Sequence, residues 1–336
     1  MTIREQTEQM QAENLSKYAS LPQNSRGRER PVEDCPIRTA YARDRDRIIH
    51  CKSFRRLMHK TQVFLSPESD HYRTRLTHTL EVSQIARTIA SALRLNEELT
   101  EAIALGHDLG HTPFGHAGER ALKHCCPYGF SHPVQSVRVV EKLENGGAGL
   151  NLTFEVRNGI GCHSYSNPSA EGAALTLEGR VVYYADKIAY LNHDLEDAMR
   201  AQVLSEEEIP WTIKYDLGRT KSQRITALIE SIVQNSGEDI RMDPTTGAAF
   251  KQFHKFMYDA VYTSPAAKGE EGKAQAVVEQ LYAYFTAHPK ELPQEYQQIL
   301  KDSDEARAAC DYISGMSDRY AVAIYERLYV PQPWSI

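Results

Sequence analysis

The sequence has few of the features that mark secreted, membrane-spanning or disulfide-stabilised proteins. No apolar run approaches the roughly 18 residues needed to cross a bilayer, and the first twenty residues are too polar for a secretory signal. The six cysteines include no CxxC pair, so we expect reduced thiols that fill apolar space. These absences predict a cytoplasmic protein without a membrane partner.

The sequence also lacks a positive net charge, internal repeats and low-complexity tracts. Its net charge of −6 argues against a general nucleic-acid binder, although the arginines of residues 25–30 and 43–47 could form a local basic strip. An apolar fraction of 41% and a charged fraction of 25% are typical of a soluble protein with a sizeable core. A length of 336 residues suits one large domain or two ordinary ones.

Period-2 alternation is almost absent, whereas apolar residues recur at helical spacing along most of the chain. This spacing predicts a mainly α protein, with helices in residues 73–95, 96–111, 175–204, 222–235 and 273–289. At most a short hairpin is expected near Gln62 to Leu65, and residues 208–218 and 242–250 are predicted to be loops. Changes in composition predict an N-terminal strap (1–40), a helical core (41–205) and an accessory helical region packed on it (206–336).

Ionisable residues interrupt the apolar faces of three predicted helices. His78 shares a face with Val82, Ile85 and Ile89, His107 with Leu99 and Ile103, and Asp186 with Leu175 and Val182. A single buried imidazole or carboxylate is usually a hydrogen-bonded core residue, because burial without a partner costs several kcal/mol. Three of them, with Asp108 adjacent to His107, favour convergence on a divalent cation such as Fe, Mn, Ni, Co or Zn.

The segment GHDLGHTPFGHAGE, residues 106–119, concentrates histidines and acids among glycines. We expect Gly106 and Gly110 to let other backbone or a substrate approach closely, and His111, one turn after His107, to face the same cavity. Pro113 and Gly115 are expected to stop the helix and turn the chain, with a new helix beginning near Phe114 or Gly115. That turn could bring His116 and Glu119 over the metal; alternatively, they are ordinary residues of a loop and a first helical turn.

The order His78, His107-Asp108, Asp186 resembles the H…HD…D signature of HD-domain metal-dependent phosphohydrolases. The longer string HDLGHTPFGHAGE is similar to the deoxyguanosine triphosphate triphosphohydrolase (dGTPase) family of HD enzymes. Three further strings share this similarity, which covers residues 41 to about 200: RDRDRIIHCKSFRRLMHKTQVF, RTRLTHTLEVSQIAR and ADKIAYLNHDLEDA. The resemblance implies an HD-domain helical bundle that cleaves a deoxynucleoside triphosphate (dNTP), dGTP among the substrates, to deoxynucleoside and inorganic triphosphate.

The resemblance also implies the roles of individual residues. His78, His107, Asp108 and Asp186 would hold one divalent metal ion (Mn, Fe, Ni, Co, Mg or Zn), with a second metal less expected. His116 and Glu119 would form the catalytic pair, with His111 beside them; His116 would protonate the leaving 5′-oxygen while Glu119 fixes its tautomer. The implied substrate-binding residues are Arg75, Lys187 and His132 near the phosphates, Tyr190 on the nucleotide, and Gln62 and Asp194 on the sugar. His163 is expected to be structural or to support a ligand.

Other functions stay open at this level. An HD phosphohydrolase could act instead on nucleoside monophosphates or guanosine tetraphosphate, and a nucleotide-sensing protein could have lost catalysis. Family resemblance further implies a homo-oligomer, a hexamer or a dimer, a possible dNTP allosteric effector and possible weak binding of single-stranded DNA. Base preference and the native metal do not follow from any single motif.

Overall fold

The computed structural model describes residues 1–62, 73–164, 172–263 and 270–331. Within these ranges the chain forms helices joined by loops and no β-strand; the only bridges described there are two isolated pairs, Arg28–Thr153 and Thr61–Thr74. The predicted mainly α fold is therefore confirmed. None of the helices in the described ranges is both long enough and apolar enough to cross a membrane.

The chain folds into two compact units, and each is built from separate stretches of sequence. Unit 1 comprises Met1–Ile49, His78–His107 and Asn151–Lys268, and unit 2 comprises His50–Thr77, Asp108–Leu150 and Gly269–Ile336. These units cut across the sequence-based division at residues 40 and 205, because the chain leaves unit 1 and returns to it. The three predicted regions stay a prediction.

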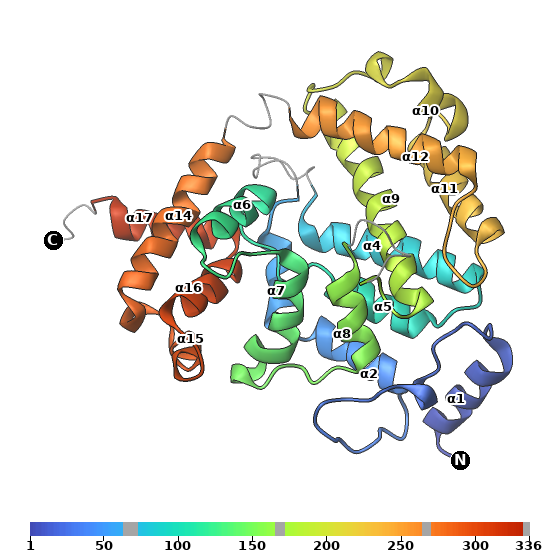
Figure 1. The fold of residues 1–336 in the computed structure, drawn as a ribbon, viewed down its shortest axis with the longest axis horizontal. Helices are drawn as coiled ribbons and strands as arrows, with labels where there is room; N and C mark the ends of the chain where they lie inside the picture. The colour runs from blue at the N-terminus through green and yellow to red at the C-terminus, as the bar shows by residue number, and fades with distance from the viewer. Residues whose placement is uncertain (63–72, 165–171, 264–269, 332–336) are drawn as a thin grey trace. The chain divides into compact units, whose positions relative to one another are not determined.

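Unit 1 is organised around α5 (Glu97–Gly106), which packs against α2 (Ala40–Ile49), α8 (Phe154–Cys162) and α9 (Leu177–Arg200) (Figure 1). Its other helices are α1 (Ile3–Asn14), most of α4 (Arg75–Ala92), α10 (Trp211–Asp216), α11 (Lys221–Asn235), α12 (Pro244–Met257) and the π-helical turn η6 (Tyr258–Tyr262). Leu99 and Ile103 of α5 are completely buried, as are Ile160 of α8 and Val182 of α9. The 3.6-residue spacing of such side chains gives each helix one apolar face, and burial of these faces holds the unit together.

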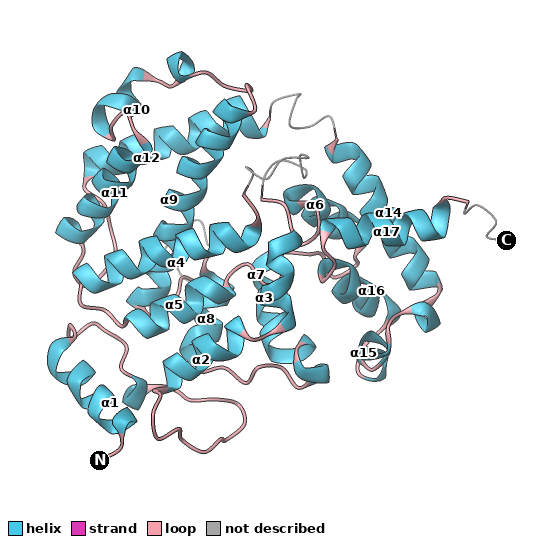
Figure 2. Cartoon of the chain, turned by 180° about the vertical axis from the view of Figure 1, so that it is seen from behind, coloured by secondary structure: helices cyan, strands magenta, loops and turns pink. Residues whose placement is uncertain are grey.

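Unit 2 is organised around α14 (Glu271–Ala287), which packs against α6 (Gly115–Cys125), α16 (Glu305–Ser314) and α17 (Asp318–Tyr329) (Figure 2). The remaining helices described in this unit include α3 (Lys52–Arg56), α7 (His132–Arg138), the π-helical turn η3 (Val139–Leu143) and α15 (Gln294–Gln297). A continuous apolar core joins α6 to the C-terminal helices through residues such as Leu122, Val278, Leu281 and Ile313.

The predicted helix positions agree with the structure except that the helix expected over residues 96–111 ends at Gly106, and except at two segments predicted to be loops. Residues 208–218 and 242–250 were expected to be loops, but they contain α10 and the start of α12, so both expectations are wrong. Asp243 caps α12 by accepting hydrogen bonds from the backbone N–H groups of Thr245 (2.9 Å) and Thr246 (3.0 Å), and Pro244 occupies the first helical position. Asp followed by Pro is a helix-start signal as well as a turn signal.

Leu175 is 57% exposed and precedes the start of α9 at Leu177, so its predicted place on the buried face of Asp186 is wrong. The predicted hairpin near Gln62 to Leu65 lies mostly outside the described residues, although Thr61 pairs with Thr74.

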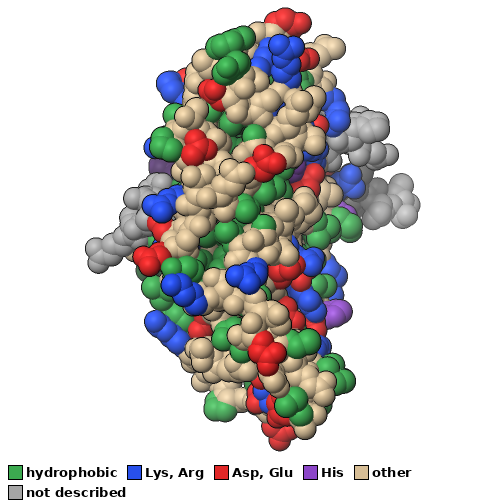
Figure 3. All heavy atoms as spheres, turned by 90° about the vertical axis from the view of Figure 1, so that its right-hand side faces the viewer, with side chains coloured by type: hydrophobic (Ala, Val, Ile, Leu, Met, Phe, Trp, Pro, Cys, Tyr) green, Lys and Arg blue, Asp and Glu red, His purple; other side chains and the backbone are tan. Residues whose placement is uncertain are grey.

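On the face drawn in Figure 3, basic and acidic side chains are interspersed, and no one-sign patch is visible there.

Candidate active site

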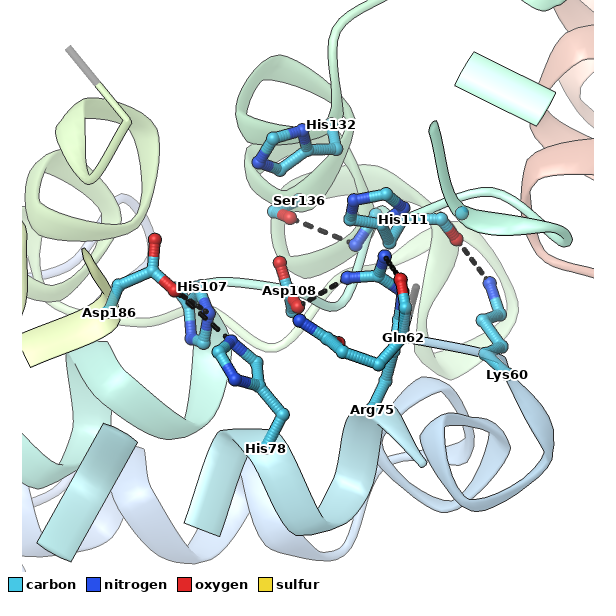
Figure 4. A network of polar contacts seen from close by, with 12 residues as sticks. Lys60, Gln62, Arg75, His78, His107, Asp108, His111, His132, Ser136 and Asp186 are labelled. Carbon is cyan, nitrogen blue, oxygen red and sulfur yellow. Dashed lines mark hydrogen bonds and ion pairs between the residues drawn. The ribbon is translucent and has the colours of Figure 1, made fainter. Parts of the chain in front are cut away.

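In unit 1, His78, His107 and Asp186 converge from three helices. His78 projects from α4, His107 follows the last residue of α5, and Asp186 lies in the middle of α9 (Figure 4). The Nε2 atom of His78 lies 3.1 Å from Oδ1 of Asp186, and the Nε2 atom of His107 lies 3.8 Å from the same oxygen. The apolar faces that predicted burial of these histidines therefore bring them onto one carboxylate.

The backbone fixes the tautomer of His107 and of a further histidine, His163. Nδ1 of His107 lies 2.6 Å from the carbonyl oxygen of Ala104, and Nδ1 of His163 lies 2.7 Å from that of Ile160. A carbonyl only accepts hydrogen bonds, so each Nδ1 carries the proton. In the neutral imidazole, Nε2 then presents its lone pair.

The donor set in unit 1 suits a divalent cation. Ligand atoms of His107, His163 and Asp186 all lie within 4.8 Å of one another. Metal-binding histidines typically donate their other N–H to a carbonyl, as both histidines do here. His163 was expected only to be structural or to support a ligand; like His107, it follows the last residue of a helix, and that shared position is the sequence signal for its orientation.

The carboxylate of Asp186 is held in its ionised form. Burial alone would raise its pKa, but the hydrogen bond with His78 and the charges of His107 and His163 lower the pKa to about 2. Asp186 is therefore a negatively charged group at neutral pH, as a metal ligand must be.

In unit 2, Arg75 and Asp108 form a buried ion pair. Nη1 of Arg75 donates to Oδ2 of Asp108 at 2.7 Å, and Nη2 donates to the backbone oxygen of Gln62 at 3.4 Å (Figure 4). Both side chains are at most 5% exposed. Arg75, which was predicted to contact phosphate, therefore forms an ion pair with Asp108, which was predicted to be a metal ligand.

Glu119 in unit 2 joins two histidines. Its carboxylate accepts a hydrogen bond from the backbone N–H of His132 at 2.9 Å and lies 3.1 Å from Nδ1 of the same residue. Nδ1 of His116 is 3.6 Å from the carboxylate, and the ring of His111 stacks on that of His132 with centroids 4.6 Å apart. His132, predicted near the phosphates, therefore belongs to the same group of side chains as the predicted pair His116–Glu119.

These contacts shift the pKa values of the buried members in opposite directions. Burial alone would raise the pKa of Glu119, but its contacts with His116 and His132 hold it well below the usual range. Burial lowers the pKa of His132, yet Glu119 outweighs this effect and the pKa is raised. Burial lowers the pKa of His111, so its ring is neutral near pH 7.

The turn that carries His116 begins where the sequence predicts it. Helix α6 starts at Gly115, and Phe114 precedes it in the left-handed conformation with φ of 61°. The preceding helix does not continue to Pro113, however, because α5 ends at Gly106. His111 is therefore not on the same helix as His107, and the expectation that it lies one helical turn beyond His107 is wrong.

The two glycines of the HD segment both pack closely, Gly110 against other backbone, as expected, and Gly106 against side chains instead. A methyl group on Gly110 would clash with the backbone of α7, lying 2.8 Å from the carbonyl oxygen of His132 and closer still to Gln135 and Ser136. A methyl group on Gly106 would lie 3.0 Å from Cγ1 of Ile160.

The predicted substrate residues of α9 lie along one side of that helix in unit 1. Lys187 lines a groove of about 830 Å³ between α9 and α12, together with His254. Asp194 is buried and accepts a 2.7 Å hydrogen bond from the hydroxyl of Tyr262. The ring centroids of Tyr190 and Tyr262 are 6.4 Å apart. Tyr262 could not be predicted as a partner of Asp194 from the sequence, because the two residues are 68 positions apart.

Comparison with known proteins agrees with this geometry. Residues 75–191 match the HD domain, and residues 240–327 match the phosphohydrolase-associated domain. The helical fold and the histidine–aspartate clusters are thus those of an HD-domain phosphohydrolase.

Curated relatives extend the similarity over nearly the whole chain. A deoxyguanosinetriphosphate triphosphohydrolase-like protein of Caldanaerobacter subterraneus is 52% identical, covering 99% of this chain and 98% of the relative. Proteins of the same description from Desulfatibacillum aliphaticivorans and Clostridium perfringens strain 13 are each 47% identical, covering 99% of both chains. The chain belongs to the deoxyguanosinetriphosphate triphosphohydrolase-like family.

Proposed function

We propose that this protein is a metal-dependent dNTP triphosphohydrolase, with dGTP among its substrates. The reaction would convert a dNTP and water to a deoxynucleoside and inorganic triphosphate. The observation that carries the proposal is the grouping of Glu119 with His111, His116 and His132, on the segments that directly follow the His107–Asp108 pair. The 52% identity to a relative described as deoxyguanosinetriphosphate triphosphohydrolase-like supports the same reaction.

We propose His78, His107, Asp108 and Asp186 as the ligands of one divalent ion. The 3.1 Å approach of His78 to Asp186, the fixed tautomer of His107 and the peptide bond between His107 and Asp108 support this set. Mn, Fe, Ni, Co, Mg and Zn are all candidates for such a mixed imidazole–carboxylate set. When bound, such an ion polarises a phosphoryl group and makes a water molecule more acidic.

In the proposed reaction, the oxygen of water forms a bond to the α-phosphorus while the bond from that phosphorus to the sugar 5′-oxygen breaks. The leaving 5′-oxygen needs a proton, and His116 is positioned to supply it because its ring is 66% exposed. Glu119 faces Nδ1 of His116, so it would orient the ring with Nε2 directed at the substrate. His132 holds Glu119 from the other side, and the buried neutral ring of His111 stacks on His132.

The remaining predicted residues would bind the substrate. Lys187, in the groove beside α12, would supply positive charge for the triphosphate, and Arg75, which is buried and paired with Asp108, is proposed to contact a phosphate oxygen as well. Tyr262 orients Asp194, which we propose as the acceptor for the sugar 3′-hydroxyl, with Tyr190 beside them. Gln62 is proposed to touch the sugar, and close packing around it and Tyr190 would exclude a 2′-hydroxyl group.

Assembly, regulation and location stay predictions of this proposal. They are a homo-oligomer (hexamer or dimer), a possible dNTP effector, possible weak binding of single-stranded DNA and a cytoplasmic location.

Product analysis tests the proposed reaction. Metal-reconstituted protein is incubated with each of the four dNTPs singly and mixed, and the products are separated by ion exchange. Intact triphosphate and a deoxynucleoside are expected, ribonucleoside triphosphates should be cleaved more slowly, and activity only in the mixture would indicate an effector. Release of orthophosphate or pyrophosphate would refute the assignment.

A further inference from the structure

The loop that carries His111 and leads to His116 is anchored to the C-terminal helices of unit 2. Asp318, the first residue of α17, is 6% exposed and binds two separate segments. Its Oδ1 accepts a 2.9 Å hydrogen bond from the backbone N–H of Phe114. Its Oδ2 accepts from the backbone N–H of Thr61 at 3.0 Å and also from the Thr61 hydroxyl.

The hydrogen bond from Phe114 to Asp318 lies at the point where the loop adopts an unfavourable backbone conformation. Phe114 has φ of 61° and Gly115 has φ of 56°, so two consecutive residues are left-handed. For a residue with a side chain, this conformation is strained and persists only when the surroundings enforce it. His116 follows two residues later, so the direction in which its ring leaves α6 depends on this turn.

A second buried contact ties the same loop to α16. The ammonium group of Lys60 donates to the backbone oxygen of His111 (Figure 4). It also donates, at 2.8 Å, to the backbone oxygen of Ser314, the last residue of α16. Lys60 is 2% exposed. The loop is thus held at both ends, at His111 by Lys60 and at Phe114 by Asp318.

We propose that Asp318 is a positioning residue for catalysis: it holds the Phe114 turn and thereby places His116 against its substrate. This gives the C-terminal helices, which contribute no residue to the proposed reaction, a direct part in it. The role of His116 rests on the proposed function, whereas the hold of Asp318 on the loop does not.

The test compares Asp318→Asn with Asp304→Asn. Asparagine keeps the size of aspartate but has one acceptor oxygen, so it cannot accept from both Phe114 and Thr61. Asp304 is a matched control, because its carboxylate likewise accepts from two separate groups of the same unit, the Arg307 N–H (2.8 Å) at the start of α16 and the Tyr128 hydroxyl, and makes no described contact with residues 111–116. Amide hydrogen exchange of residues 111–119, metal content, kcat and KM are measured for both variants and the wild type.

We expect Asp318→Asn to speed exchange in residues 111–119, to lower kcat by about 100-fold, as for a misplacement of roughly 1 Å, and to leave KM and metal content nearly unchanged. Asp304→Asn should match the wild type in exchange of residues 111–119, metal content, kcat and KM. In a His116→Ala background, Asp318→Asn should cause no further loss of kcat, since both act through one ring.

Two results would overturn the positioning role. One is unchanged exchange in residues 111–119 of Asp318→Asn, and the other is an undiminished effect of Asp318→Asn on kcat in the His116→Ala background. If the wild type cleaves no dNTP, the proposed function fails, and the exchange measurement still decides whether Asp318 holds the loop.

Discussion

Replacement of Gly110 by alanine tests the close approach of the HD segment to α7. The added Cβ would lie 2.8 Å from the carbonyl oxygen of His132 and closer to the backbone of Gln135 and Ser136, whereas ordinary contact begins at 3.4 Å. Backbone atoms cannot rotate away as a side chain can, so the loop and α7 must separate by more than 0.6 Å, the difference between these two distances.

The cost has two parts. Overpacking of a well-packed site costs about 1–3 kcal/mol. Separation also weakens the 2.9 Å hydrogen bond from the Gly110 N–H to the Ser136 hydroxyl, which contributes about 0.5–1.5 kcal/mol. We therefore expect Gly110→Ala to lower the free energy of unfolding by about 2–4 kcal/mol. Because His132 begins α7 and holds Glu119, activity should fall as well.

The matched control is Gly272→Ala in the first turn of α14, where an added methyl meets no atom within 4 Å. Alanine favours a helix over glycine, so this variant should be as stable as the wild type or slightly more stable. Denaturant unfolding of both variants, with metal removed, gives the comparison. Equal stability of Gly110→Ala and Gly272→Ala would refute the close packing of Gly110 on α7.

Three further predictions follow from contacts within single units. Arg75→Met should destabilise the metal-free protein by about 3–5 kcal/mol, because the buried Asp108 carboxylate loses its ion pair with Arg75. In denaturant unfolding, the double variant Asp108→Asn, Arg75→Met should lose much less stability, since it carries no buried carboxylate at position 108. Asp243→Ala should cost about 1 kcal/mol through the lost cap of α12, and Asp243→Asn should recover most of it in thermal unfolding. The pKa of Glu119 is depressed from 4.5, so its stabilising contribution is complete above that pH and is lost as the pH falls below it. The stability difference between the metal-free wild type and Glu119→Gln should therefore shrink as the pH is lowered from 5 to 3, and a constant difference would contradict the contacts of Glu119 with His116 and His132.

The sequence predicted the parts of the site that depend on helical period. His78 and His107 lie on the apolar faces of α4 and α5, and period alone indicated that they are buried. The start of α6 at Gly115 was also predictable, because proline and glycine act on the local backbone. Local rules fail for contacts between distant segments: Asp318 is 204 positions from Phe114, and no periodic pattern relates the two. For the same reason, the contact between Tyr262 and Asp194 could not be predicted from the sequence.

The position of His107 after the last residue of α5 gives one side chain two separable tasks. Its Nδ1–H satisfies the carbonyl of Ala104, one of the oxygens that a helix end leaves without a partner, and the same bond fixes the tautomer whose Nε2 we propose as a metal ligand. In asparagine, Nδ2 is attached to Cγ just as Nδ1 is in histidine, so His107→Asn can keep the first task while losing the second.

We therefore expect His107→Asn and His107→Ala both to lose bound metal, measured by elemental analysis after dialysis. Without metal, His107→Asn should be close to the wild type in stability, whereas His107→Ala should lose about 0.5–1.5 kcal/mol for the missing hydrogen bond, and more for the space left by the ring. Equal metal-free stabilities of the two variants would show that the Ala104 bond does not stabilise the end of α5. Full metal retention by His107→Asn would show instead that Nε2 of this histidine is not a ligand.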